Sequence, residues 1–231
     1  MPFNKTLTIK QENKTMIQLY SNNNVILARY LMATRIQNIY YNLLIQSLMK
    51  HCKVFVLRID VALPPEIVLS AISVFTHRYI ETERRAGNDP LYLTVREISS
   101  EGRIHHHLLL FFNGNRTWKP YQHFLNARTV LENITRLYGY GPGHIDECNR
   151  GHRNGIMIER NTISYDDLFE VLRQSSYLAK TESKETTPGK SYFYSKVPIV
   201  QLSNEDITRN FQALFPNLIF GIGSQWYSAF R

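Results

Sequence analysis

Cysteine is scarce in this chain: its 231 residues include only two, Cys52 and Cys148. Two widely separated thiols exclude a small disulfide-stapled scaffold, and they also exclude a structural zinc site built from four cysteines. A chain of this length can bury a hydrophobic core without such staples. The low cysteine content therefore predicts a protein of a reducing compartment, with the cytoplasm as its location.

Long apolar runs are missing as well. The most apolar stretch, residues 25–50, is interrupted by Arg29 and Arg35, whereas a membrane-spanning helix needs about 20 mostly apolar residues. The N-terminal residues Met1 to Lys5 carry positive charge, but the apolar segment that follows such charge in a secretory signal peptide is absent. The sequence predicts neither a membrane span nor a secretory leader.

Acidic residues are outnumbered by basic ones. Lys and Arg number 27 and Asp and Glu number 19, so the net charge is 27 − 19 = +8 at pH 7. An excess of this size favours an anionic partner, with nucleic acid as the first candidate and a membrane surface as the second. Hydrophobic residues make up 43% of the chain and charged residues 20%, which is typical of a globular protein rather than a disordered one.

Hydrophobic periodicity divides the chain into helices and strands. After a polar tail over 1–24, we expect a helix over 25–50, a strand over 53–61 and a helix from Pro64 to about Arg84. Two strands over 91–98 and 103–112 and a helix over 118–138 should follow. The last part should contain a ribbon formed by 144–147 and 156–160, a helix from Ser164, a short strand after 191 and a helix around 203–213. This order predicts an α+β fold with a central antiparallel sheet of about five strands flanked by helices. Residues 1–50 would then form an N-terminal helical extension, and residues 51–231 the main domain.

The strongest chemical signal is the run Ile104-His105-His106-His107-Leu108. Because side chains alternate between the two faces of a strand, His105 and His107 share one face and His106 points to the other. Two imidazoles at this spacing can bind one metal ion together. The alternative is that these histidines lie on the surface or have satisfied hydrogen bonds in the core.

A third metal ligand would have to come from a neighbouring strand, and Glu97 is the candidate. The face on which it lies depends on the register of the hairpin. Pairing of Ile98 with Arg103 places Glu97 on the wrong face, whereas pairing of Ile98 with Ile104, across the longer loop or a bulge, places it opposite His105. Two histidines and one carboxylate suit a divalent ion, Mg²⁺ or Mn²⁺, that holds a phosphate.

A second signal is the sequence Tyr177-Leu178-Ala179-Lys180 in the helix expected from Ser164. Spacing of three places Tyr177 and Lys180 on the same helix face. A phenol is a poor nucleophile at its ordinary pKa of about 10, but a neighbouring ammonium favours the phenolate. A tyrosine that attacks a phosphate forms a phosphotyrosine ester, which conserves energy for rejoining. The alternative is a tyrosine that only packs in the core.

Together these motifs resemble those of the HUH endonuclease superfamily, which comprises relaxases and rolling-circle replication initiators. More narrowly, the chain resembles the inovirus replication-protein family, also described as the YagK/YfjJ C-terminal domain. The resemblance extends over about residues 50–225. The matching stretches are Leu57-Arg58-Ile59-Asp60-Val61, Val95-Arg96-Glu97, Ile104-His105-His106-His107-Leu108-Leu109-Leu110-Phe111-Phe112-Asn113 and Ser176-Tyr177-Leu178-Ala179-Lys180-Thr181.

The resemblance implies an RRM-like sheet and a role for each site residue. His105 and His107 would be the metal pair, Glu97 the third ligand, Tyr177 the nucleophile and Lys180 its partner. The implied activity is that of a phage or prophage replication initiator in the cytoplasm of a bacterial host. It would nick single-stranded or origin DNA, leaving a 5′-phosphotyrosine and a free 3′-hydroxyl that the host polymerase extends.

Two positions depart from the family pattern. His106 occupies the middle of the histidine motif, where an apolar or aromatic residue is usual, and Gln225 stands where a basic residue is expected. The chain also lacks the Gly-rich phosphate-binding loop of helicases. Unwinding of the duplex is therefore expected to come from a host helicase as partner.

Candidate DNA contacts are more dispersed than the site motifs. Arg150, His152 and Arg153 lie on a polar turn from which they can reach phosphates, although such residues often serve only solubility. Arg58 and Asp60 interrupt the apolar pattern of the first strand. We expect Arg58 to contact nucleic acid, and Asp60 is placed to orient a ligand.

Two other functions are compatible with the same motifs. The first is a nucleic-acid-binding regulator without catalytic activity, which would bind DNA or RNA independently of metal. The second is a hydrolytic metallonuclease, which would use water as its nucleophile and would not need Tyr177. The sequence leaves open the origin that is recognised, the choice between Mg²⁺ and Mn²⁺, and the oligomeric state.

Overall fold

The computed structural model describes residues 34–64, 70–99, 103–141, 143–147, 153–179 and 192–216. These residues form the helices α1 (Thr34–Lys50), α2 (Ser70–Arg85), α3 (Pro120–Leu137), α4 (Tyr165–Tyr177) and α5 (Asn204–Leu214), and the strands β1 (Lys53–Ala62), β2 (Leu91–Ile98), β3 (Ile104–Asn113), β4 (His144–Asp146), β5 (Ile156–Glu159) and β6 (Tyr192–Tyr194). Parts of the first two expected helices, 25–33 and 65–69, lie outside the described residues.

The six strands form one sheet in the order β4-β1-β3-β2-β6, and β5 also pairs with β1. All the strand pairs are antiparallel. From β1 to β4 the chain runs β–α–β–β–α–β, which is the split βαβ arrangement of ferredoxin-like and RRM-like folds. The predicted α+β fold with a helix-flanked antiparallel sheet is confirmed, with six strands in place of about five.

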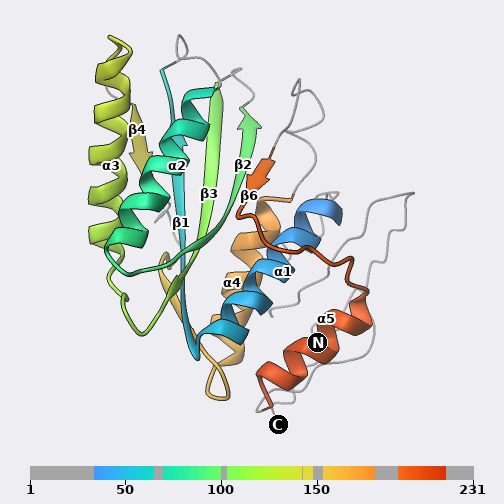
Figure 1. Ribbon diagram of the computed structural model, residues 1–231. Helices are drawn as coiled ribbons and strands as arrows, with labels where there is room; N and C mark the ends of the chain where they lie inside the picture. The colour runs from blue at the N-terminus through green and yellow to red at the C-terminus, as the bar shows by residue number, and fades with distance from the viewer. Residues whose placement is uncertain are drawn as a thin grey trace, which may run out of the picture.

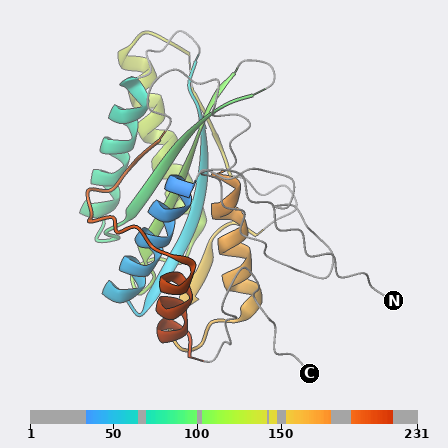
Figure 2. The ribbon, with the colours of Figure 1, turned by 90° about the vertical axis from the view of Figure 1, so that its right-hand side faces the viewer.

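Helices cover both faces of the sheet (Figures 1 and 2). On one face α2 and α3 pack against apolar side chains that include Leu57, Leu108 and Leu110. On the other face α1, α4 and α5 pack against a second apolar cluster that includes Leu93 and Leu109. Because the sheet is buried on both faces, its central strands are almost continuously apolar.

The N-terminal helix α1 belongs to the second of these clusters. Its residues Ile36, Tyr40, Leu44 and Leu48 are buried together with side chains of the sheet and of α5. The described part of this segment is therefore a packed helix rather than one exposed for a partner. Among the described residues no helix combines the length and apolar character that a membrane span requires.

The expected ribbon of 144–147 and 156–160 is wrong, because β4 and β5 do not pair with each other. Instead, each pairs with the same edge of β1: β4 with Asp60–Ala62 and β5 with Lys53–Val56. They thus form one interrupted edge strand. The Asn154 side chain bridges the gap, since it donates to the carbonyl of Arg58 at 2.7 Å and accepts from the Arg58 amide at 3.0 Å.

Candidate functional site

The β2–β3 hairpin has the register that brings the predicted ligands together. Ile98 pairs with Ile104, and Glu97 lies directly opposite His105. Residues opposite each other on antiparallel strands point to the same face. Glu97, His105 and His107 therefore share the face that α1, α4 and α5 cover. The alternative register, with Ile98 opposite Arg103, is excluded.

Strand β1 adds a second carboxylate to this face. Asp60 lies opposite His107, and Arg58 lies two residues before it, opposite Leu109. Charged side chains in a buried strand require partners, because an unpaired buried charge costs several kcal/mol. The chain supplies these partners locally, since Arg58 Nε donates to Asp60 Oδ1 at 2.9 Å and Nη2 donates to Oδ2 at 2.8 Å.

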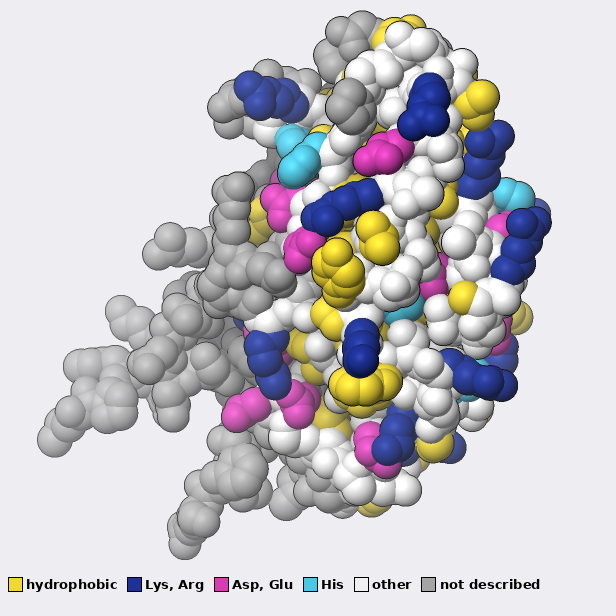
Figure 3. All heavy atoms as spheres, turned by 90° about the vertical axis from the view of Figure 1, so that its left-hand side faces the viewer, with side chains coloured by type: hydrophobic (Ala, Val, Ile, Leu, Met, Phe, Trp, Pro, Cys, Tyr) yellow, Lys and Arg dark blue, Asp and Glu magenta, His cyan; other side chains and the backbone are white. Residues whose placement is uncertain are grey.

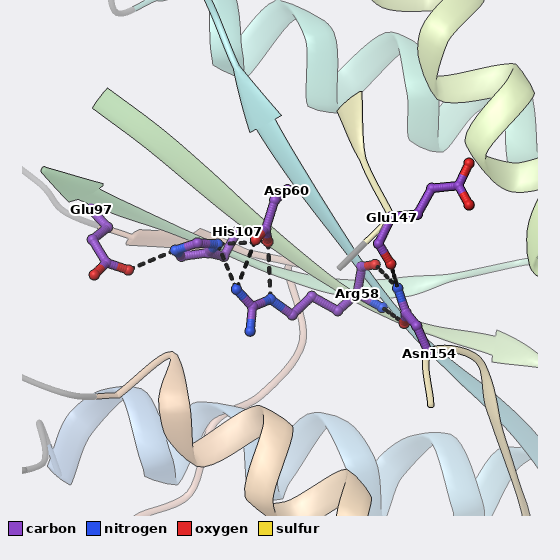
Figure 4. Close-up of polar contacts among 6 residues, drawn as sticks. All are labelled: Arg58, Asp60, Glu97, His107, Glu147 and Asn154. Carbon is purple, nitrogen blue, oxygen red and sulfur yellow. Dashed lines mark hydrogen bonds and ion pairs between the residues drawn. The ribbon is translucent and has the colours of Figure 1, made fainter. Parts of the chain in front are cut away.

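His107 lies between the two carboxylates (Figure 4). Its Nδ1 is 2.6 Å from Asp60 Oδ1, and its Nε2 is 2.6 Å from Glu97 Oε2. The tautomer of the ring decides which of its nitrogens donates in these contacts. The three side chains come from β1, β2 and β3, so the position of the imidazole ring is fixed from both sides by the pairing of the sheet.

The negative charge of Asp60 is strongly stabilised. Burial alone would raise its pKa, but hydrogen bonds and charge from His107 and from Arg58 outweigh burial and hold the pKa well below its usual value of 3.8. The Asp60 carboxylate is therefore ionised at neutral pH. A carboxylate at Nδ1 of a histidine fixes the orientation of the ring and raises the basicity of the other nitrogen, as it does behind metal-binding histidines.

Tyr177 is the last residue of α4 and lies against the same group. Its ring centroid is 6.3 Å from that of His107, with the planes at 75° to each other. The guanidinium carbon of Arg58 lies 5.1 Å from the Tyr177 ring centroid, a cation–π contact. The buried residues Val171 and Leu172 anchor α4 on the sheet and so hold the tyrosine in place.

His106 points to the opposite face, as alternation along the strand predicts. It is 2% exposed and lies opposite Val61 of β1, on the face covered by α2 and α3. Burial, together with the positive charge of Arg96, lowers the pKa of His106 to about 3. A ring that stays neutral in the core is a packing element and has no access to ligands on the other face.

The donor set suits Mg²⁺ or Mn²⁺, which take carboxylate oxygens and accept imidazole nitrogen. Glu97, His105, His107 and Asp60 provide two carboxylates and two imidazoles on one face of the sheet. Within the described ranges, however, no group of three or more His, Cys, Asp or Glu side chains has the geometry to hold a metal ion. The residues fit the ion by type, and His107 would have to give up its contact with Glu97 to hold one.

Several predicted residues cannot be placed in this site. Lys180, Arg150 and His152 lie outside the described residues. Arg153 is exposed and pairs with Asp167 at the start of α4, while its carbonyl accepts from Gln174. Nothing in the described structure brings Arg153 to the histidines.

The expected role of Arg58 as a DNA contact is only partly compatible with its position. Its side chain is 14% exposed and is occupied by Asp60, and its Nη2 also lies 3.0 Å from His107 Nδ1. The sequence signal for this position was the Arg-x-Asp pair in a buried strand. That signal indicated a shared face, but not that Asp60 would reach His107.

One acidic residue of this face was missed. Asp146 of β4 lies opposite Asp60, so its side chain points to the same face at the edge of the sheet. The sequence contains no local signal for it, because the pairing of β4 with β1 joins segments far apart in the chain.

The chain matches no protein-family model, no curated protein and no solved structure.

Proposed function

We propose that the protein is a single-tyrosine, metal-assisted endonuclease that nicks and rejoins single-stranded DNA, acting as a rolling-circle replication initiator of phage or prophage type. The observation that supports this most is the position of Tyr177, whose ring lies 6.3 Å from that of His107 and over the guanidinium of Arg58. A nucleophile of the right type thus lies beside the histidine and carboxylates that the histidine motif predicts.

In this proposal the Tyr177 phenolate attacks the phosphorus of one DNA linkage. The bond from phosphorus to the 3′-oxygen breaks as the bond from phosphorus to the phenolic oxygen forms. The phenolic proton leaves to solvent, and the departing 3′-oxygen takes up a proton to become a hydroxyl. One phosphoester bond replaces another, so its energy is conserved. Attack by a 3′-hydroxyl on the phosphotyrosine therefore reverses the reaction and rejoins the strand.

The other residues have separate roles. Glu97, His105 and His107 would hold a divalent cation, Mg²⁺ or Mn²⁺, which neutralises charge on the phosphate oxygens when bound. Asp60 would keep Nδ1 of His107 protonated and the ring oriented. Arg58 would hold the Tyr177 ring against the site through its cation–π contact. Lys180, three residues after Tyr177, would be the partner that the sequence motif predicts.

The partners follow from the product. A nick with a free 3′-hydroxyl is a primer, so a host polymerase would extend it, and a host helicase would unwind the duplex ahead. The net charge of +8 favours an acidic polymer as substrate. The proposed location is the bacterial cytoplasm, where these host proteins are found.

The experiment that tests the proposal uses a pool of labelled single-stranded oligonucleotides and a double-stranded phage-origin substrate, each incubated with Mn²⁺ or with EDTA. Separation on a denaturing gel shows whether label moves with the protein. A protease-sensitive adduct that requires the metal supports the proposal. Cleavage without an adduct contradicts it in favour of a nuclease that uses water.

One observation favours a second candidate, a nucleic-acid-binding regulator. The contacts of His107 with Asp60 and Glu97 connect three strands without any metal ion. Such a group would also serve as a structural link between β1, β2 and β3. Binding of DNA that is insensitive to EDTA, with no cleavage and no adduct on either substrate, would establish this function instead.

A further inference from the structure

Large apolar side chains are exposed in the first turns of α3 and in the residues that lead into it, on the far side of the sheet from Tyr177. Trp118, Tyr121 and Leu125 are 66%, 67% and 41% exposed. Tyr121 and Leu125, four residues apart, lie on one side of α3, and Trp118 lies two residues before Pro120, the first residue of the helix. Figure 3 shows this side of the molecule, where hydrophobic side chains lie among Lys and Arg side chains. Isolated exposed apolar residues are ordinary, whereas exposed aromatic rings near one another in the fold are a candidate binding surface.

Basic side chains flank the exposed Trp118 ring. Between Glu101 and Glu132 the chain contains no Asp or Glu, while Arg116 and Lys119 flank Trp118 and both are exposed. The Lys119 ammonium lies 4.8 Å from the centroid of the Trp118 ring. We call Arg116, Trp118, Lys119, Tyr121 and Leu125 the α3 platform. Its charge suits an anionic occupant, whereas an apolar protein partner would have to bury the ammonium of Lys119.

Buried hydrogen bonds hold the backbone of the α3 platform in place. Thr117 Oγ1 lies 2.7 Å from Nε2 of His123, and Nδ1 of His123 lies 3.0 Å from Glu83 Oε2. The carboxylate of Glu83 is completely buried and also accepts from Asn126 and Asn88.

The lead-in to the helix is fixed on its other side as well. The amides of Arg116 and Thr117 donate to the Asn113 carbonyl, and Pro120 begins α3. Trp118 is therefore exposed on a fixed scaffold rather than on a loose loop. A surface that is already held in its binding geometry loses less conformational entropy when a ligand binds, and this favours binding.

We propose that the α3 platform is a binding site for single-stranded nucleic acid, separate from the site around Tyr177. Bases would stack on the rings of Trp118 and Tyr121, and the phosphates would contact Arg116 and Lys119. Aromatic rings interleaved with basic side chains are the usual means of binding single strands without sequence preference. The proposal goes beyond the nicking activity, since it needs neither Tyr177 nor a metal ion.

The test uses the fluorescence of Trp118. The chain has two tryptophans, so a Trp226→Phe variant reports on Trp118 alone. Titration with oligo-dT in EDTA, where metal-dependent cleavage is suppressed, should quench this fluorescence as a thymine stacks on the ring. The dissociation constant should rise with salt, because phosphate contacts release counterions. Unchanged Trp118 fluorescence at saturating oligo-dT would overturn the proposal.

Substitutions locate the binding. Trp118→Ala and Tyr121→Ala should each weaken oligo-dT binding about tenfold. Lys119→Gln should make the salt dependence of log K less steep by about 0.7 for the phosphate contact that it loses. Met49→Ala is the matched control, because Met49 is 67% exposed but belongs to α1 on the other side of the sheet. Equal binding by all four variants would contradict the proposal.

Two further readouts separate this proposal from its rivals. If Trp118→Ala changes the sedimentation behaviour from a dimer to a monomer without weakening oligo-dT binding, the platform is an interface between two copies, and the proposal is wrong. Adduct formation on a short origin oligonucleotide should survive Trp118→Ala. If the protein forms no adduct on origin DNA while oligo-dT still quenches the fluorescence of Trp118, the nicking function alone is overturned and the α3 platform stands as proposed.

Discussion

Asp60 Oδ1 lies 2.6 Å from Nδ1 of His107, on the neighbouring strand of the sheet. This contact connects the histidine motif of β3 with the Arg-x-Asp pair of β1. On the other side of the ring, Nε2 of His107 contacts Glu97 of β2. Through Arg58, the same group also touches the Tyr177 ring. The candidate site is therefore one connected set of side chains from three strands and one helix.

Asp60→Asn tests the role of the carboxylate behind His107. The amide keeps the shape of the side chain but loses the charge, so Nδ1 of His107 loses its ionised partner. Metal-dependent adduct formation should fall by about 10- to 100-fold, and half-saturation should need more Mn²⁺. A metal titration of the adduct yield measures both quantities. The control is Glu132→Gln on α3, which should behave as the wild type. An unchanged metal requirement in Asp60→Asn would show that Asp60 does not support His107 in metal binding.

His105→Ala and His106→Ala separate the two faces of β3. His105→Ala and likewise His107→Ala should abolish metal-dependent cleavage in a folded protein, because each removes an imidazole from the site face. His106→Ala leaves a cavity in the core under α2 and α3, so it should lower the free energy of unfolding by about 2 kcal/mol or more while the folded fraction still cleaves. Thermal unfolding and cleavage rates distinguish these effects. Loss of cleavage in a folded His106→Ala protein would refute the assignment of faces.

Arg58→Lys tests whether the guanidinium positions Tyr177. Lysine keeps the positive charge but loses the bidentate contact with Asp60 and the flat group over the ring. We expect kcat for nicking to fall about tenfold, with little change in KM, because the nucleophile is displaced while the DNA contacts remain. A fall in affinity with unchanged kcat would instead mean that Arg58 binds DNA directly. Arg78→Lys, an exposed position on α2, is the matched control.

Glu83 makes stability depend on pH. Burial would raise its pKa, but the hydrogen bonds from His123, Asn126 and Asn88 and the charge of His123 together lower it below 4.5. A carboxyl group whose pKa is lower in the folded state stabilises the fold above its unfolded pKa, and this contribution is lost as the pH falls through the folded value.

Glu83→Gln should therefore unfold more readily than the wild type at pH 7, by about 3 kcal/mol, and the difference should shrink below pH 4.5. Urea unfolding at pH 7 and at successively lower pH measures this difference. A gap that stays constant over that range would mean that the charge of Glu83 does not stabilise the fold.

Local patterns in the sequence predicted much of the fold. Strand β2 and most of β1 and β3 follow from runs of apolar and β-branched residues, and the hairpin follows from the polar stretch between Ile98 and Ile104. Alternation along β3 correctly separated His105 and His107 from His106. The register of the hairpin was open from sequence, since a one-residue slip changes the face of Glu97, and the structure selects the register in which Glu97 faces the histidines.

Contacts between distant segments were not predictable in the same way. The pairing of Asp60 with His107 and with Asp146 depends on which strands lie beside β1, and no local pattern specifies that order. The wrong ribbon of β4 and β5 has the same cause: two short strands near each other in sequence suggested a hairpin, whereas the free edge of β1 pairs with both. The contact of Tyr177 with Arg58 likewise depends on where α4 packs.

The most direct measurement compares Tyr177→Phe with Tyr194→Phe in the adduct assay with Mn²⁺. Tyr194 of β6 lies opposite Leu93, on the same side of the sheet, so it is a matched tyrosine outside the site. We expect Tyr177→Phe to bind the oligonucleotide but to form no covalent adduct. Tyr194→Phe should form the adduct as the wild type does, with the label mapped to Tyr177 by mass spectrometry. An adduct of normal yield in Tyr177→Phe would contradict the role of Tyr177 as the nucleophile.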